Sequence, residues 1–353
     1  MNNFLTRFIP QSASRKSLAT ALIAAFLTTA CTASAQKTSE PEASVSKETP
    51  SFLTTIDFKN PEWNRDTYAR LDGDLDPTKE KVGWLKGKVF GVRPNEAVRE
   101  LFIMEGFSFT RTKKLPDGSI RRMLREVVFY KDPKTGEILE TWDNPYTGET
   151  VRVVPIANDP YNFTISAYKQ QANAYAGTNL GKPEKEPFLL NWEEGPNDTL
   201  ILNTGINLFY PNRLQPSTWV RESAGTFNRV SEQFIYVLKK ADVENPAMTH
   251  VPAIGTWSRI TPWLPWMLMG QAEGHISYFS TFTTLPGGLD ELPADIREAA
   301  RAIDPKFLAA PTEDYGPNES SLEAYATEQT PAPVPEGWEP PKAPAAPVWP
   351  PKQ

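Results

Sequence analysis

The amino-acid sequence predicts a mainly β protein whose single large antiparallel sheet is curled or closes into a calycin-like barrel, with a few short helices. Three observations support this fold class. About ten segments are rich in Val, Ile, Phe, Tyr and Trp, they follow one another along the chain, and turn sequences separate several of them. Because an open sheet of this size leaves unpaired edges, a curled or closed sheet is favoured. A β-sandwich of two sheets is the alternative.

The predicted elements begin with a short helix. Asn60 precedes Pro61, which suits an N-cap followed by the first helical residue, and the helix extends to Leu71. A second helix is predicted over residues 294–303, where apolar side chains recur at helical spacing. The candidate strands are residues 84–92, 100–111, 120–130, 137–142, 149–157, 162–168, 199–210, 227–238, 256–261 and 275–285.

A turn that occurs twice is the strongest local pattern. Its copies are Asp-Pro-Lys-Thr-Gly-Glu at residues 132–137 and Asn-Pro-Tyr-Thr-Gly-Glu at residues 144–149. In each copy Asp or Asn can bond the backbone that follows, Pro fixes φ near about −65°, and Gly accepts the left-handed conformation that closes a hairpin. The pattern predicts a three-stranded antiparallel meander over residues 125–130, 137–142 and 149–157.

Residues 1–35 have the pattern of a secretory signal peptide. Three basic residues precede an apolar run at residues 18–27, and a stretch of small residues ends at Ala35. We expect cleavage after Ala35 and a periplasmic or secreted protein. Lipid attachment at Cys31, which would give an outer-membrane lipoprotein, is the alternative. The apolar run is shorter than the roughly twenty residues that a membrane-spanning helix needs.

Composition divides the rest of the chain into three parts. Residues 36–50 are polar with hardly an apolar side chain, which predicts a flexible spacer. Residues 51–328 form the predicted β-rich domain. Residues 329–353 form a predicted disordered tail, because nine of the 23 residues from Pro331 onward are proline and favour extended backbone.

Several classes of function are excluded by composition and motif content. Cys31 is the only cysteine, so the mature chain has no disulfide and no thiol chemistry. The formal net charge of −6 falls to −9 without the three basic residues of the signal, which excludes nucleic acid and leaves membrane contact only through a lipidated Cys31. Nucleotide, flavin and serine-hydrolase motifs are absent, so no cofactor is expected. His250 and His275 are too far apart for a paired motif, and no metal is expected.

Polar residues near the doubled turn form the first candidate site. Strand alternation places Glu126 and Tyr130 on one face. If these residues or Asp159 pointed into an apolar interior, burial would raise the pKa of the carboxylates and create a general acid or base. Asn144 and Asn158 are the expected ligand contacts beside them. The alternative is that Asp and Asn at these positions form turns by bonding their own backbone.

Residues 257–270 form the second candidate site, because they contain three Trp and two Met while Pro262 and Pro265 prevent a regular helix. The aromatic side chains can line a pocket for a flat apolar ligand, with Arg259 binding a carboxylate or stacking on a ring. A core plug and a membrane-contacting wedge are the alternatives. The expected apolar contacts of the ligand are Trp142, Trp257, Trp263, Trp266 and Met267.

These segments resemble an uncharacterised bacterial and fungal family catalogued as domain of unknown function 1838. The resemblance covers about residues 55 to 325 and implies membership of that family, which brings no established activity with it. The matching motifs lie at residues 105–107, 130–137, 142–149, 158–160, 257–259 and 265–270.

Three functions are compatible with these residues. The first is a cofactor-independent lyase, isomerase or hydrolase that acts on an apolar aromatic or polycyclic small molecule inside the barrel. Glu126, Tyr130, Asp159 and Arg259 are its candidate catalytic residues, and at least two of them should meet in one cavity of a few hundred Å³. The second is a non-catalytic carrier of a hydrophobic ligand. The third is a structural protein of the cell envelope.

Overall fold

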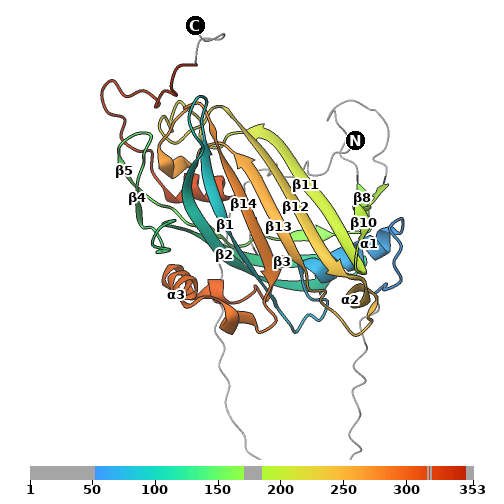
Figure 1. Cartoon of the computed structure of the whole chain (residues 1–353). Helices are drawn as coiled ribbons and strands as arrows, with labels where there is room; N and C mark the ends of the chain where they lie inside the picture. The colour runs from blue at the N-terminus through green and yellow to red at the C-terminus, as the bar shows by residue number, and fades with distance from the viewer. Residues whose placement is uncertain (1–51, 171–184, 316–317, 319, 347–353) are drawn as a thin grey trace, which may run out of the picture. The chain divides into compact units, whose positions relative to one another are not determined.

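A sheet of ten antiparallel strands dominates the structure (Figure 1). The computed structural model describes residues 52–170, 185–315, 318 and 320–346, so the predicted signal peptide and spacer lie outside the described residues. The strands follow the order β10-β11-β12-β13-β14-β1-β2-β3-β6, and β7 also pairs with β3. The prediction of a mainly β protein with one large antiparallel sheet and a few short helices is confirmed.

The long strands coincide with the predicted segments, whereas the segments between residues 137 and 168 form only short strands. This difference follows from the turns and prolines that interrupt the chain there. The strands are β1 (Lys81–Val92), β2 (Arg99–Lys114), β3 (Ile120–Lys131), β4 (Thr141–Asp143), β5 (Thr150–Arg152), β6 (Ile156–Asn158), β7 (Phe163–Ile165), β8 (Tyr168–Gln170), β9 (Lys185–Pro187), β10 (Trp192–Gly195), β11 (Thr199–Pro211), β12 (Phe227–Lys239), β13 (Ile254–Thr261) and β14 (His275–Thr284).

The predicted meander is confirmed in the pairing of its second and third strands and wrong in the pairing of its first and second, although both turns form as expected. Gly136 and Gly148 have φ angles of 75° and 74°. After the first turn only the isolated bridge between Lys131 and Ile138 forms, and the second turn closes a separate two-stranded sheet of β4 and β5. Strand β6 then returns to pair with β3. The β4–β5 hairpin leaves the main sheet because a valine of β5 and another just after it pack against an aromatic cluster on the concave face.

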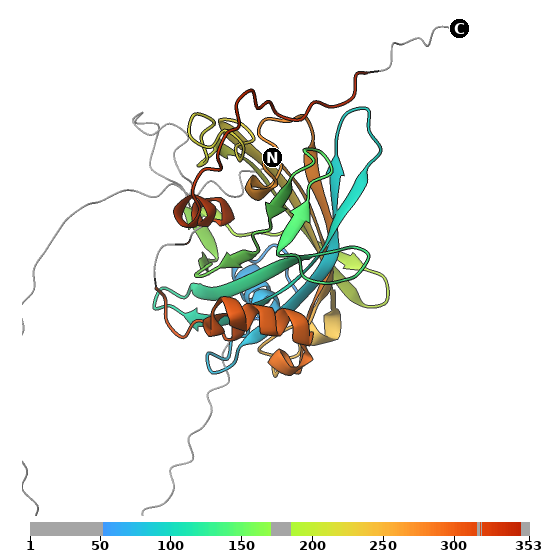
Figure 2. The same cartoon turned by 90° about the vertical axis from the view of Figure 1, so that its left-hand side faces the viewer.

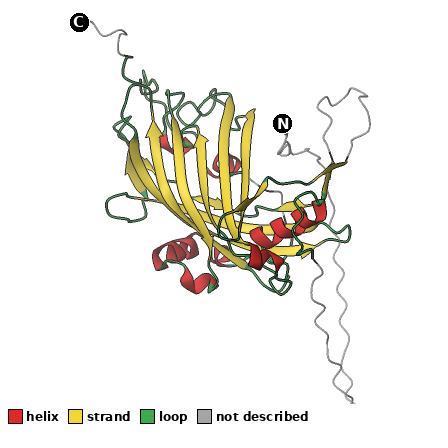
Figure 3. Ribbon diagram, turned by 45° about the vertical axis from the view of Figure 1, so that its right-hand side comes forward, coloured by secondary structure: helices red, strands yellow, loops and turns green. Residues whose placement is uncertain are grey.

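The main sheet curls without closing, since its pairing path ends at β10 on one side and at β6 and β7 on the other (Figure 3). Glycines on the concave face permit the curl. A Cβ at Gly87 would lie 2.2 Å from the carbonyl oxygen of Phe279, and a Cβ at Gly106 would lie 2.3 Å from that of Val127. Side chains at these positions would therefore force neighbouring strands apart.

The helices pack against the sheet and its ends. Helix α1 (Pro61–Asp72) begins as predicted, with Asn60 as its N-cap, and α3 (Ala294–Ile303) has the predicted bounds. Helix α3 buries Ile296 and Ala300 against the outer face of β2 and β3 (Figure 2). No helix in the described part of the chain is long and apolar enough to cross a membrane. The remaining helices are α2 (Lys240–Glu244), η1 (Pro265–Met267), η2 (Gly288–Glu291), η3 (Pro305–Leu308) and α4 (Ser321–Glu328).

The first part of the predicted disordered tail, residues 329–346, contacts the body of the fold. The backbone N–H of Ala332 donates to Glu222 (2.5 Å), and Arg93 donates to the carbonyl of Pro341 (2.8 Å). Proline lacks an N–H but keeps its carbonyl, so an extended proline-rich segment can still accept such bonds. Composition predicted the extended backbone but could not indicate these donors.

Candidate functional site

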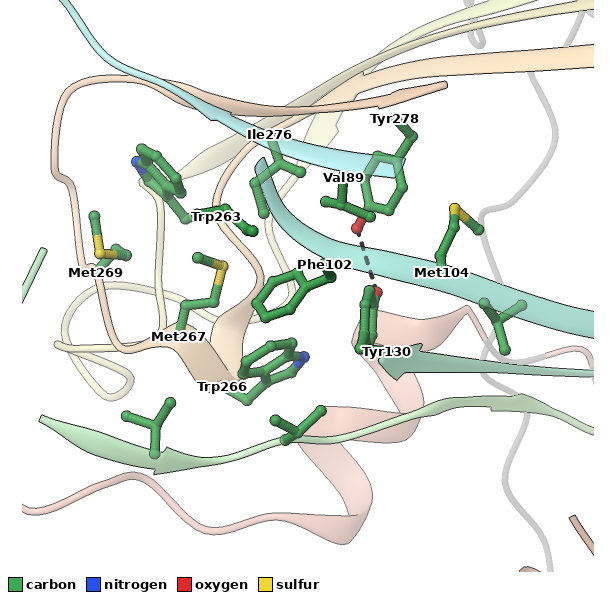
Figure 4. Close-up of a cluster of buried hydrophobic side chains, with 14 residues drawn as sticks. Val89, Phe102, Met104, Tyr130, Trp263, Trp266, Met267, Met269, Ile276 and Tyr278 are labelled. Carbon is green, nitrogen blue, oxygen red and sulfur yellow. Dashed lines mark hydrogen bonds between the residues drawn. The ribbon is translucent and has the colours of Figure 1, made fainter. Parts of the chain in front are cut away.

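One end of the concave face is closed by the segment that contains η1. Trp263, Trp266 and Met267 are all buried there (Figure 4). Asn144 holds this segment, because its Nδ2 donates to the carbonyl of Met267 (2.7 Å) while its Oδ1 accepts from the backbone N–H of Tyr146 (2.9 Å). Asn144 therefore forms its turn and anchors the segment, and it is not among the residues that line the cavity described below.

Four aromatic rings pack together at this end of the sheet. The ring centroid of Phe102 lies 5.4 Å from Tyr130, 4.9 Å from Trp142 and 5.5 Å from Trp266. The tilted and edge-to-face arrangements are those that aromatic pairs prefer. Trp142 and Met267 thus belong to a packed core, as the core-plug alternative predicted for the second candidate site.

A cavity of about 90 Å³ remains beside this aromatic cluster. Of the residues predicted from the sequence, Tyr130, Arg259, Trp263 and Trp266 line it. Its volume is smaller than the expected few hundred Å³ and below the range of about 300–1,000 Å³ that is usual for drug-sized ligands. The wall combines the aromatic segment with polar side chains from the main sheet and with α4.

The hydroxyls of Tyr130 and Tyr278 form a pair in this cavity. Their oxygen atoms are 3.3 Å apart, as the dashed line in Figure 4 shows. Burial raises the pKa of Tyr130 well above its usual range, and the neighbouring Tyr278 raises it further. Burial also raises the pKa of Tyr278, although Arg259 and the hydrogen bond with Tyr130 partly offset this effect. Both hydroxyls are therefore protonated at neutral pH.

Arg259 lies directly opposite Tyr278 on β14 and opposite Glu232 on β12. Its Nε is 3.6 Å from Glu232 Oε1, while Glu232 Oε2 accepts a hydrogen bond of 2.9 Å from Trp257 Nε1. Burial on its own would lower the pKa of Arg259, but Glu232 and the surrounding tyrosines outweigh burial and raise it. Arg259 therefore stays charged. Trp257, predicted as a ligand contact, supports Glu232 and is not among the residues that line the cavity.

Asn228 and Tyr210 complete the polar wall, and they face each other across β11 and β12. Burial raises the pKa of Tyr210, and the charge of Arg259 partly offsets this effect. Asn228 is only 4% exposed, and its Nδ2 makes no hydrogen bond to any described residue. The Nε atom of Arg259 is likewise without a hydrogen bond in the described part of the chain.

Helix α4 covers the side of the cavity opposite the sheet. Ser321, Leu322 and Tyr325 line the cavity, yet α4 has no fully buried residue (Figure 2, dark red). The Tyr325 ring contacts that of Trp219 at 5.8 Å, and burial raises the pKa of Tyr325 to about 12. The helix is therefore held by few apolar contacts compared with the strands beneath it.

Glu126 and Asn158 form a cross-strand pair outside the cavity. They lie opposite each other on β3 and β6, and Asn158 Nδ2 donates to Glu126. Burial raises the pKa of Glu126, while Asn158 lowers it. At about 3.3 Å per strand residue, Glu126 lies roughly 13 Å along β3 from Tyr130. The two predicted catalytic groups share a face of β3, but only Tyr130 lines the cavity.

Asp159 lies on the other face from Asn158 and takes part in an ion-pair network. Its side chain is 4% exposed, Arg125 Nε donates to it (2.7 Å), and Lys306 Nζ lies 3.0 Å away. Tyr315 also donates a hydrogen bond to it. Burial would raise the pKa of Asp159, but these three partners outweigh burial and lower it. Asp159 is thus an ionised tether between β6 and the segment before α4, away from the cavity.

A comparison with protein families gives a match over residues 78–329 to the family described as "Protein of unknown function (DUF1838)". The chain belongs to the DUF1838 family. No curated protein matches the sequence. The DUF1838 domain contains every strand of the main sheet and all of the cavity wall, whereas α1 and the proline-rich residues 331–346 lie outside it.

The motifs that predicted DUF1838 membership have two different roles in the structure. Asp132 and Asn144 are turn formers, with Asp132 Oδ1 accepting from the N–H of Lys134 (2.7 Å). Arg259 and Trp266 line the cavity. Some of the motif residues of the DUF1838 domain therefore stabilise the fold, and others line the candidate site.

Sequence reasoning missed Tyr278, Tyr210 and Asn228. Alternation within the predicted strand at residues 275–285 does place Ile276 and Tyr278 on one face, so the sequence could have indicated that Tyr278 points to the interior. Asn228 lies at the start of a strand, where polar residues are common, so nothing in the sequence distinguishes it as a site residue. Only strand pairing brings these three side chains from β11, β12 and β14 to the same cavity of the DUF1838 domain.

Proposed function

We propose that the DUF1838 domain binds a compact apolar, preferably aromatic, molecule through one of its oxygen atoms and acts on it by cofactor-independent acid–base chemistry. One observation carries the proposal: the Tyr130–Tyr278 hydroxyl pair and the Arg259 guanidinium line one cavity together with Trp263 and Trp266. Preorganised donors of this kind stabilise negative charge that develops on a ligand oxygen.

Tyr278 is the better proton donor of the pair. Arg259 and Tyr130 both favour its ionised form, whereas the hydrogen bond with Tyr278 disfavours ionisation of Tyr130. A ligand carbonyl that accepts from Tyr278 gains negative charge when the adjacent carbon loses its proton to a water molecule, and Arg259 stabilises that charge. Water is the proton acceptor in this step because no carboxylate of the described residues lines the cavity. Removal of one such donor typically costs about 10²–10³ in turnover.

The size of the cavity restricts the ligand. At about 90 Å³ it is smaller than the roughly 150 Å³ cavity that is known to accept benzene in another protein. A single ring therefore requires small movements of α4, and a polycyclic molecule requires α4 to move away. Helix α4 suits such movement because none of its residues is fully buried.

A non-catalytic carrier is the second candidate, and one observation favours it. No carboxylate in the described part of the chain lines the cavity, and Glu232 contacts Arg259 from outside the lining. A site whose lining has donors and a cation but no carboxylate can hold a ligand without converting it. For either function we also propose export to the periplasm or beyond, from the signal pattern of residues 1–35.

Native mass spectrometry of protein from its own cell envelope tests the proposal. We expect a bound small molecule in the wild type and in Tyr278→Phe, with Tyr168→Phe as an exposed control. The molecule extracted from Tyr278→Phe is then incubated with wild-type protein. Conversion supports the enzyme, whereas an unchanged molecule supports the carrier. If neither protein carries a molecule, both ligand hypotheses fail and a structural envelope role remains.

A further inference from the structure

Two hydrogen-bond donors in the cavity wall have no acceptor. Asn228 Nδ2 is buried and makes no hydrogen bond to any described residue, and the same holds for Arg259 Nε. Leaving a buried donor without a partner costs about 1–3 kcal/mol. Two such donors on one cavity surface are therefore available to an acceptor group of a ligand.

The two donors lie on neighbouring strands of the concave wall. Arg259 is on β13 and Asn228 is on β12, four residues before Glu232, the cross-strand partner of Arg259. Tyr210 on β11 continues the same arc of the wall. Arg259 also lies opposite Tyr278 on β14, so the arc adjoins the Tyr130–Tyr278 pair at Arg259 and extends from it toward Asn228 and Tyr210.

Glu232 does not satisfy Arg259. Arg259 Nε lies 3.6 Å from Glu232 Oε1 and makes no hydrogen bond to it. The other carboxylate oxygen of Glu232 accepts a hydrogen bond from Trp257. The Arg259 side chain is 29% exposed as a whole and lines the cavity. A planar guanidinium with free N–H groups binds a carboxylate through two parallel hydrogen bonds.

We infer that Arg259 and Asn228 form a carboxylate-binding subsite, so that the ligand carries a carboxylate next to its apolar body. This inference rests on the proposed function because it uses the same cavity. An organic carboxylate is favoured over an inorganic anion, because Trp263, Trp266 and Pro265 supply an apolar surface across the cavity. The donors also select against cations, since no acidic side chain in the described part of the chain lines the cavity.

NMR titration of the tryptophan indole N–H signals tests this subsite with matched probes. Acetate and acetamide have nearly the same size and differ in charge, and both are small enough for the cavity with α4 in place. We expect acetate to bind at least about tenfold more tightly, as a hydrogen bond to a charged group contributes about 1.5–3 kcal/mol. Arg259→Met should abolish this preference, and Asn228→Leu should weaken acetate about fivefold without weakening acetamide. Arg229→Gln, on the exposed face of the same strand, is the control.

Several outcomes would overturn the inference. These are equal affinity for acetate and acetamide, no binding of acetate, tighter binding of inorganic phosphate than of acetate, and a preference that survives both substitutions. If Arg259→Met does not fold, Arg259→Lys and Asn228→Leu decide the question. Benzoate separates this inference from the proposed function: acetate binding without any gain for benzoate keeps the subsite and rejects the aromatic ligand.

Discussion

Asp159→Asn should weaken folding without affecting the cavity. The substitution removes the charge that Arg125 and Lys306 share, and it leaves a partly buried guanidinium without its carboxylate. Removal of one partner from a buried pair costs roughly 3–5 kcal/mol. Arg125 keeps hydrogen bonds to Tyr315 and to two backbone carbonyls, so we expect a loss of about 2–3 kcal/mol. Lys306 is half-exposed and adds less than about 1 kcal/mol.

Urea denaturation of the two proteins at pH 7 measures this loss in the free energy of unfolding. Asp290→Asn, where the carboxyl group is 97% exposed, is the control and should change stability by less than about 0.5 kcal/mol. The pKa of Asp159 is lowered in the folded state, so its contribution is present above the unfolded value of about 3.9 and is lost as the pH falls through the lower folded value. The difference between wild type and variant should therefore shrink below about pH 4. Unchanged stability at pH 7, or loss of ligand binding at full stability, would refute the tether.

Three further predictions follow from packing and burial. Gly106→Ala should lower the free energy of unfolding more than Gly136→Ala, as measured by thermal unfolding. A Cβ at residue 106 would clash with backbone atoms, whereas a Cβ at residue 136 meets no atom within 4 Å. We expect a loss of about 1–3 kcal/mol for Gly106→Ala and about 1 kcal/mol for Gly136→Ala. Equal losses would contradict the steric account of the curl. Trp266→Ala should cost about 3–5 kcal/mol in urea denaturation, and a much smaller loss would show that the aromatic cluster is not a packed core. Burial lowers the pKa of His250 to about 4, so folding favours the neutral imidazole. The contribution of His250 to the free energy of unfolding is therefore fully present above pH 6.5 and is lost progressively as the pH falls toward 4. Urea midpoints should fall over this range in the wild type and change less in His250→Gln, and parallel profiles would contradict the assignment.

The main sheet was predictable because its signals are local. Alternating apolar residues define the long strands, Asn60 and Pro61 define the start of α1, and Gly136 adopts the positive φ that its turn requires. These features depend on residues a few positions apart in the sequence. The meander was not predictable in the same way, because pairing of β3 with β6 depends on what the intervening hairpin can bury.

The candidate site was predictable only in part. Tyr130, Arg259, Trp263 and Trp266 were expected and line the cavity, whereas Glu126, Asp159 and Trp257 were expected there and do not line it. Strand alternation determines the face on which a side chain lies but not its distance from groups on other strands.

The sequence alone therefore determined the fold class, the family and the residue types available for chemistry, since each follows from composition, periodicity or short motifs. The tertiary structure alone decided which of those residues share a cavity. Tyr278, Asn228 and Tyr210 join Arg259 through strand register and the curl of the sheet, and both depend on contacts between residues far apart in the chain. Asp159 and Asn144 are removed from the site by the same contacts, because they bond groups that only the folded chain brings near them.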